Sequence, residues 1–121
     1  MSGLIYHLVA AEDFRAVPPG APYRPAAFEQ DGFIHCTGDV ALLLQVANLA
    51  YRKNEGEFLV LDIDPDRLTS ELRYERPAPP PPPGSALAEA IFPHIYGPIN
   101  RAAIVAVRPA RRAADGTFLA V

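Results

Sequence analysis

Several features that define other protein classes are scarce or missing in this 121-residue chain. Cys36 is the single cysteine, which excludes an internal disulfide and any zinc site built from several cysteines. No apolar run approaches the ~20 residues that cross a bilayer. The first residues also lack the basic and apolar blocks of a secretory signal. We therefore expect a cytoplasmic protein with no membrane contact.

Positive charge is scarce as well. Eleven Lys and Arg residues stand against fourteen Asp and Glu residues, which gives a net charge of −3. Binding to an extended nucleic acid needs a field of positive charge that displaces counterions from the phosphates. The composition therefore argues against such a partner.

Apolar residues make up 50% of the sequence, so residues 1–121 are expected to form a single domain around one core. Apolar, β-prone patterns predict buried strands at residues 4–9, 33–37, 58–63 and 102–107, and a more exposed strand at 72–76. Asp115-Gly116 predicts a final hairpin turn. With few helices and no strand–helix alternation, we expect an α+β fold of small, strongly bent antiparallel sheets.

The clearest helix follows Asp39, a good N-cap residue, and carries apolar residues at three- and four-residue spacing from Val40 to Tyr51. Asn48 and Arg52 lie one turn apart on another flank of this helix. From there we expect both to reach a neighbouring binding site.

Prolines mark two further segments. The run Pro79 to Pro83 predicts polyproline II, which makes a stiff spacer or surface loop. The segment Phe92 to Ile99 contains two prolines and a glycine, so we expect it to be a stiff loop that holds His94 and Tyr96 in place.

The three histidines, His7, His35 and His94, all stand among apolar residues of strands or of this loop. A buried imidazole must find a partner, because an unsatisfied polar group costs about 1–3 kcal/mol. We expect the three to share one pocket. Strand alternation places Cys36 on the face opposite His35, which favours Cys36 as a core residue over a Cys–His nucleophile.

A set of linked motifs carries a family resemblance over essentially the whole chain. In order they are YHL at 6–8, DGFIHCT at 31–37, VANLAYR at 46–52, LVLDIDPDRL at 59–68, LRYE at 72–75, FPHIYGPI at 92–99 and DGTF at 115–118. The chain resembles the family called domain of unknown function 952. That family is grouped by fold with ADP-ribosyltransferase-like proteins, which implies a split β fold that cradles NAD or an ADP-ribosyl product.

The resemblance implies roles for individual residues. It places His7 where a first-strand residue contacts the adenosine ribose, and His35 and Thr37 where the second strand frames the nicotinamide ribose. The third position usually holds a glutamate that stabilises positive charge at the ribose carbon. Here that neighbourhood contains His94 and Tyr96.

No acidic residue lies between Glu89 and Asp115, so the expected glutamate is missing from this part of the sequence. Glu75 supplies the acid if its strand folds back to the pocket. Alternatively, His35 and His94 move an ADP-ribosyl or phosphate group without a glutamate, as in the RNA 2′-phosphotransferase branch. We rank the histidine alternative slightly higher and expect a small nucleotide related to NAD as the ligand.

Two other hypotheses remain open. Three neutral imidazoles with an open fourth position would bind zinc and activate water, as in a metal-dependent hydrolase. Tyr96 and Thr37 suit nucleotide binding better than a metal site, so we rank metal second. A non-catalytic module that binds ADP-ribose or a related nucleotide is the third hypothesis.

Overall fold

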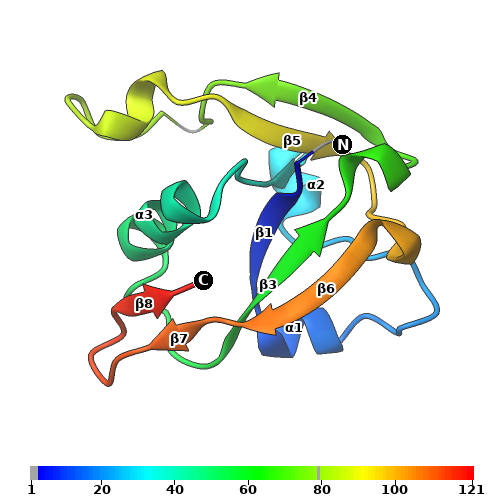
Figure 1. The fold of residues 1–121 in the computed structure, drawn as a ribbon, viewed down its shortest axis with the longest axis horizontal. Helices are drawn as coiled ribbons and strands as arrows, with labels where there is room; N and C mark the ends of the chain where they lie inside the picture. Colours follow the sequence, from blue (N-terminus) through cyan, green and yellow to red (C-terminus); the bar gives the residue numbers. More distant parts are fainter. Residues whose placement is uncertain (1–2, 79) are drawn as a thin grey trace.

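Two antiparallel sheets of three strands form the body of the protein in a computed structural model that describes residues 3–78 and 80–121 (Figure 1). The first sheet has the order β1 (Ile5–Ala10), β3 (Phe58–Ile63), β6 (Ile104–Pro109). The second has the order β2 (Ile34–His35), β5 (Phe92–Tyr96), β4 (Glu71–Glu75). A hairpin of β7 (Arg111–Arg112) and β8 (Phe118–Ala120) follows.

The main helix is α3 (Val40–Ala50). The side chain of Asp39 accepts a hydrogen bond from the Leu42 backbone N–H at 2.7 Å, so the predicted N-cap is confirmed. The other helical pieces are short: α1 (Ala11–Arg15), α2 (Phe28–Asp31) and the 3-10 turns η1 (Pro65–Arg67), η2 (Ala86–Glu89) and η3 (Arg101–Ala103). Within the described ranges, no helix has the length and apolar character that crossing a membrane requires.

Strand β3 is buried on both faces because both are covered. On one face, Val60 packs with Leu43 and Ala47 of α3 and with Phe118 of β8. On the other, alternate β3 residues pack with Ile34 and Ile95 of the second sheet. The first sheet therefore lies between α3 with the C-terminal hairpin on one side and the second sheet on the other.

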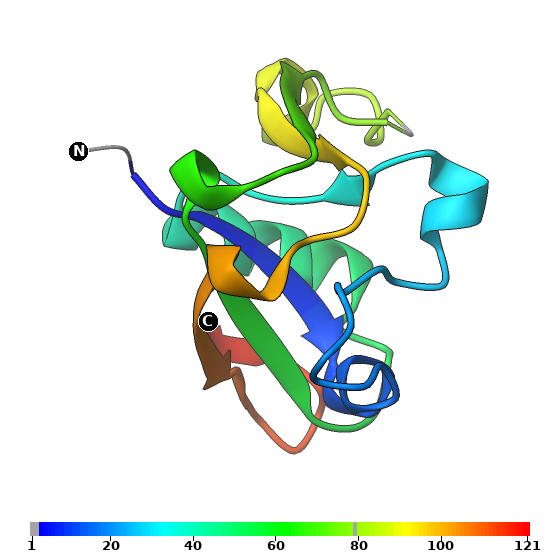
Figure 2. The ribbon, with the colours of Figure 1, turned by 90° about the vertical axis from the view of Figure 1, so that its right-hand side faces the viewer.

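The two sheets meet where β1 and the residues after β2 exchange backbone hydrogen bonds. The Tyr6 N–H donates to the Thr37 carbonyl at 2.9 Å, and the Thr37 N–H donates to the Tyr6 carbonyl at 2.8 Å. Figure 2 shows β4 and β5 above the strands of the first sheet. The prediction of an α+β domain with antiparallel sheets and one main helix is thus confirmed.

The segment predicted as a stiff loop is instead the central strand of the second sheet, and that prediction was wrong. Pro93 lies inside β5 opposite Tyr74 of β4. Proline cannot donate to a ladder, but its carbonyl still accepts from the Cys36 N–H at 3.1 Å. Pairing between β2 and β5 ends at His35 and His94, so the missing N–H falls at the end of this ladder.

Smaller differences concern strand lengths and the proline run. The strand expected at 33–37 is reduced to Ile34–His35, and the strand expected at 102–107 begins after η3. Cys36 is buried in the core as predicted, and burial raises the pKa of its thiol. Pro79, where the predicted polyproline II segment begins, lies outside the described residues; residues 80–83 form no helix or strand.

Gly97, directly after β5, packs against Ser70 at a distance that leaves no room for a side chain. A Cβ there would lie 2.4 Å from Ser70 Oγ and 2.9 Å from Ser70 Cβ. Ser70 Oγ donates a hydrogen bond to the Pro98 carbonyl at 2.6 Å, so moving Ser70 also breaks this bond. We expect Gly97→Ala to lower the free energy of unfolding by about 2 kcal/mol, measured by urea denaturation.

A Ser70→Gly background provides the matched test, because it removes the atoms that the new methyl group would strike. In the Ser70→Gly background, Gly97→Ala should lower the free energy of unfolding by only a few tenths of the loss expected in the wild type. Gly38→Ala is the control for a glycine with open space around it. Equal losses at Gly97 in both backgrounds would contradict the steric explanation.

Candidate functional site

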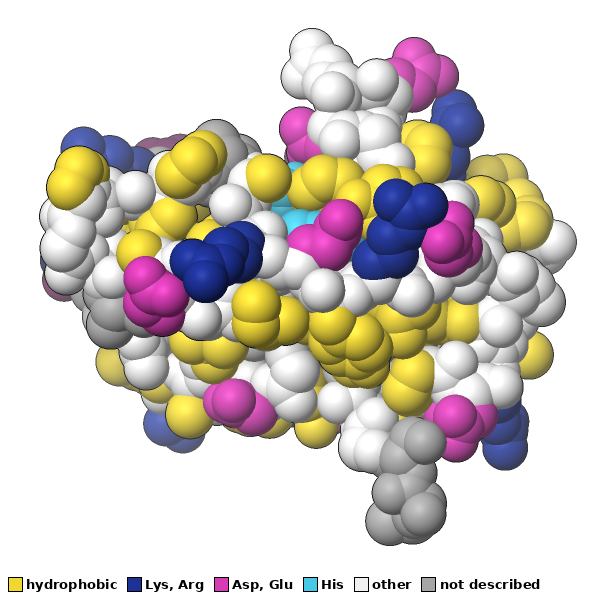
Figure 3. All heavy atoms as spheres, turned by 90° about the horizontal axis from the view of Figure 1, so that it is seen from above, with side chains coloured by type: hydrophobic (Ala, Val, Ile, Leu, Met, Phe, Trp, Pro, Cys, Tyr) yellow, Lys and Arg dark blue, Asp and Glu magenta, His cyan; other side chains and the backbone are white. Residues whose placement is uncertain are grey.

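The face of the second sheet that points away from the core carries several of the predicted site residues. Alternate strand residues point to opposite faces, so Ile34 and Ile95 enter the core while His35 and His94 project outward as a directly opposed pair. We call this surface the histidine face; its members are Phe33, His35, Glu75, His94 and Tyr96. Figure 3 views the molecule from the side of β4 and β5 and shows histidine atoms at the surface beside acidic and basic side chains.

Glu75 lies against the two polar residues of β5. Its Oε1 accepts a hydrogen bond from His94 Nδ1 at 3.0 Å and another from the Tyr96 hydroxyl. The bond from Tyr96, followed by that from His94, lowers the pKa of the Glu75 carboxyl. The carboxylate is therefore ionised at neutral pH, and its side chain is 36% exposed.

His94 is the most enclosed member of the histidine face. Its side chain is only 3% exposed, and Phe33 stacks on its ring with the centroids 4.0 Å apart. Burial lowers the pKa of His94, while the hydrogen bond to Glu75 acts in the opposite direction. At neutral pH we therefore expect an uncharged imidazole that carries its proton on Nδ1, where Glu75 accepts it.

His35 differs from His94 in being open to solvent, with 42% of its side chain exposed. Its Nε2 donates to Asp31 Oδ2 at 3.0 Å. The ring lies 5.8 Å from the His94 ring between centroids, and both rings contact Phe33. The histidine face thus holds two neighbouring imidazoles, each bound by its own carboxylate.

His7 and Thr37 occupy the layer beneath this face. Burial lowers the pKa of His7 to about 4, although the hydrogen bond to the His35 carbonyl, donated by His7 Nδ1 at 2.7 Å, opposes this shift. Thr37 is buried and pairs through its backbone with Tyr6. The structure therefore brings His35 and His94 together at the surface and leaves His7 as a support behind the backbone of β2.

Asn48 and Arg52 have their partners on the C-terminal hairpin. Asn48 Nδ2 donates to the Phe118 carbonyl at 3.0 Å, and the Phe118 N–H donates to Asn48 Oδ1 at 2.7 Å. Arg52 forms an ion pair with Asp115 at 3.4 Å. Both side chains thus fasten the hairpin to α3, and the structure does not bring them to the histidine face.

The metal hypothesis required three imidazoles around one point. Among residues 3–78 and 80–121, no group of three or more His, Cys, Asp and Glu side chains is arranged to hold a metal ion. His7 explains why, because its Nδ1 is bound to a backbone carbonyl and its ring is buried behind β2.

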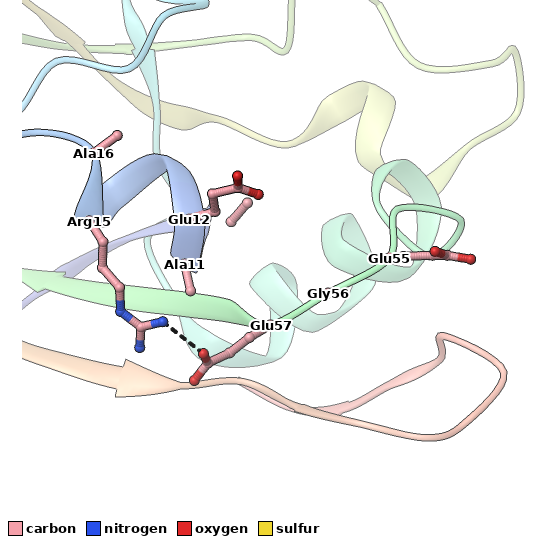
Figure 4. Close-up of a pocket in the computed structure, with 8 residues that line it drawn as sticks. Ala11, Glu12, Arg15, Ala16, Glu55, Gly56 and Glu57 are labelled. Atoms are coloured by element: carbon pink, nitrogen blue, oxygen red, sulfur yellow. Dashed lines mark hydrogen bonds and ion pairs between the residues drawn. The ribbon is translucent and has the colours of Figure 1, made fainter.

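Two surface pockets lie away from the histidine face. One, of about 560 Å³, opens between α1 and the segment before β3 and contains the Arg15–Glu57 ion pair (Figure 4). The other, of about 360 Å³, lies between the end of α3 and the hairpin and includes Arg52 among its lining residues.

Sequence reasoning missed Asp31 and Phe33 as members of this constellation. Asp31 ends α2, and Gly32 then adopts a left-handed conformation with φ of 80°, which reverses the chain. The reversal lets Asp31 reach His35 four residues later. Two signals were available in the sequence. Asp31 stands directly before a glycine, and Phe33 stands two positions before His35, which puts both on the same face of a strand.

Comparisons with known proteins identify the same fold elsewhere. The model of a family described as "Protein of unknown function (DUF952)" matches residues 8–107. The crystal structure of protein CC0527 from Caulobacter crescentus has a TM-score of 0.74 at 22% identity, over 95% of this chain and 92% of that one. A double mutant of CC0527 gives the same TM-score at 21% identity. None of the curated proteins searched matches this chain.

Proposed function

The chain belongs to the DUF952 family, and we propose that it binds a small nucleotide related to NAD on the histidine face and transfers the ADP-ribosyl group there. In this proposal Glu75 stabilises positive charge at the ribose carbon as the bond to nicotinamide breaks. His94 and Tyr96 hold the carboxylate in place, and the exposed His35 contacts the acceptor side of the ribose.

The observation that carries the proposal is the state of Glu75. One carboxylate oxygen, Oε1, receives both internal hydrogen bonds, and no described residue donates to Oε2. An ionised carboxylate with a free oxygen can accept a ribose hydroxyl and offset charge that develops nearby. In this proposal, Glu75 takes the role of the acid that the sequence lacks between Glu89 and Asp115.

A second candidate is transfer of a phosphate group by the histidine pair. It is favoured by the two imidazoles, 5.8 Å apart between centroids, each bound to a carboxylate through one nitrogen. The exposed imidazole of such a pair can exchange a proton with a reacting phosphate. The products distinguish the two candidates, because only ADP-ribosyl transfer releases nicotinamide.

Glu75→Gln tests the proposal directly, because glutamine keeps the size of the side chain and removes its charge. We expect the variant to retain NAD binding within a few-fold and to lose about 10²–10³-fold in the rate of nicotinamide release. Binding is measured by thermal-shift titration with NAD, ADP-ribose and zinc chloride, since a ligand of the folded state raises its stability. Turnover is measured by chromatography of the products.

Glu89→Gln is the matched control, since Glu89 is an exposed residue that pairs with Arg76 outside the histidine face. It should behave as the wild type. The proposal is wrong if neither nucleotide stabilises the protein, or if Glu75→Gln releases nicotinamide at the wild-type rate. Stabilisation by NAD without any release would leave a nucleotide-binding module and refute the transfer reaction.

A further inference from the structure

The Asp31–His35 pair has no evident structural purpose. Both side chains are more than a third exposed, and ion pairs of this kind contribute about 0–1 kcal/mol to stability. The pair instead determines how the His35 ring is oriented and which nitrogen carries its proton.

The fold holds His35 from two sides. Its backbone carbonyl accepts the hydrogen bond from His7 in the layer below, and its ring donates to Asp31 above. Asp31 itself is placed by the left-handed turn at Gly32. An exposed side chain is normally free to change rotamer. The hydrogen bond that the exposed ring donates to Asp31, above a backbone carbonyl held by His7, therefore points to a positional requirement.

The hydrogen bonds assign opposite tautomers to the two neighbouring imidazoles. An ionised carboxylate only accepts, so His35 carries its proton on Nε2 and His94 carries its proton on Nδ1. The unprotonated nitrogen of His35 is therefore Nδ1, to which no described residue donates. His94 is covered by Phe33, so His35 is the exposed base of the pair.

We propose that His35, oriented by Asp31, accepts the proton of a hydroxyl acceptor, of which water is the simplest, during ADP-ribosyl transfer on the histidine face. This inference rests on the proposed function. His94 lies between the two groups involved, with Glu75 on its Nδ1 side and His35 opposite it in the neighbouring strand. Glu75 thus stabilises positive charge on one side of His94, and His35 removes the proton on the other side.

The reaction balances without any further reagent. The bond between ribose C1′ and the nicotinamide nitrogen breaks, and its electron pair leaves with neutral nicotinamide. The acceptor oxygen forms the new bond to C1′, and its proton passes to His35 Nδ1 and then to solvent. A hydroxyl needs such a base because it is a poor nucleophile while it keeps its proton.

Asp31→Asn separates this role from a structural one. The asparagine amide can donate to His35 Nε2, which moves the imidazole proton to Nδ1 and removes the base. We expect kcat for nicotinamide release to fall about 10²-fold while KM and the thermal shift with NAD stay unchanged. Asp31→Glu should recover part of the rate. Glu29→Gln, a neighbour on α2 that pairs with Arg24, should have no effect.

Imidazole ¹⁵N NMR provides a readout that does not depend on turnover. The wild type should show His35 protonated on Nε2, and Asp31→Asn should show it protonated on Nδ1. NAD binding and turnover that persist unchanged in Asp31→Asn would overturn this inference and leave the proposed function intact. A wild-type His35 protonated on Nδ1 would also overturn this inference without affecting the proposed function. No response to NAD at all would overturn both.

Discussion

Lowering the pH from 6.5 to 4 should reduce the free energy of unfolding by about 3 kcal/mol through His7 alone. Burial lowers the pKa of His7 from its ordinary value of 6.5 to about 4 in the folded protein. Between these two values the unfolded chain binds the proton and the folded chain does not. The contribution of neutral His7 is therefore complete above pH 6.5 and is lost as the pH falls toward 4.

The surroundings of His7 explain why protonation is so unfavourable. Nδ1 already donates to the His35 carbonyl, and Nε2 is buried without a partner among the described residues. A second proton would place a charged N–H donor in the core with nothing to accept its hydrogen bond. The neighbouring Tyr23 hydroxyl is buried without a partner as well, 6.0 Å away between ring centroids.

Urea denaturation at a series of pH values measures this effect, with His7→Gln as the reference protein. Glutamine does not titrate, and its amide can still donate to the His35 carbonyl. Carboxylates and His94 titrate in both proteins, so their contributions cancel in the difference. The free energy of unfolding of the wild type minus that of His7→Gln should decrease by about 3 kcal/mol as the pH is lowered from 7 to 4. Parallel curves would show that His7 is not the cause.

Arg112→Ala should lower the free energy of unfolding by about 3 kcal/mol. The guanidinium donates to the carbonyls of Gly56 at 2.8 Å, and of Arg52 and Gly116 at 3.0 Å. It also lies over the Phe118 ring, 4.3 Å from the centroid. One side chain thus connects the end of α3, the approach to β3 and the β7–β8 hairpin.

Arg112→Lys should recover little of this loss, because an ammonium group cannot reproduce the planar fork that reaches several carbonyls at once. Arg111→Ala is the control, since the exposed Arg111 side chain makes no hydrogen bond or ion pair among the described residues. This change should alter stability by less than about 0.5 kcal/mol. Equal losses at the two positions would show that the contacts of Arg112 do not carry the effect. Chemical denaturation of the three variants measures all the values.

Local patterns determined which elements were predicted well. Strand β3 is apolar from Phe58 to Leu61 because both of its faces are covered, and α3 combines a capping aspartate with a regular apolar stripe. Strand β5 was missed because Pro93 normally excludes a central strand. That rule fails here because the N–H that Pro93 lacks falls where the pairing of β5 with β2 ends. The position of that end depends on the order of the strands, which a single segment of sequence does not reveal.

The residue types of the candidate site could be predicted from the sequence, but their arrangement only in part. His35 and His94 were recognised from their apolar surroundings, but their pairing depends on the register of two strands 59 positions apart. The approach of Glu75 to His94 depends on β4 lying beside β5. His7 shows the limit most clearly, since its apolar context predicts burial without revealing whether the ring faces a ligand or a backbone carbonyl.

Strand β4 has a further consequence for the behaviour of the protein at high concentration. Within the described residues it is an outer strand of its sheet, and its outward residues Glu71, Arg73 and Glu75 are all charged. Charged side chains along a sheet edge oppose pairing with a strand of another molecule. We therefore expect the Glu75 carboxylate, proposed above to stabilise charge in the reaction, also to oppose self-association. Glu75→Gln should then make the protein more prone to aggregate at high concentration.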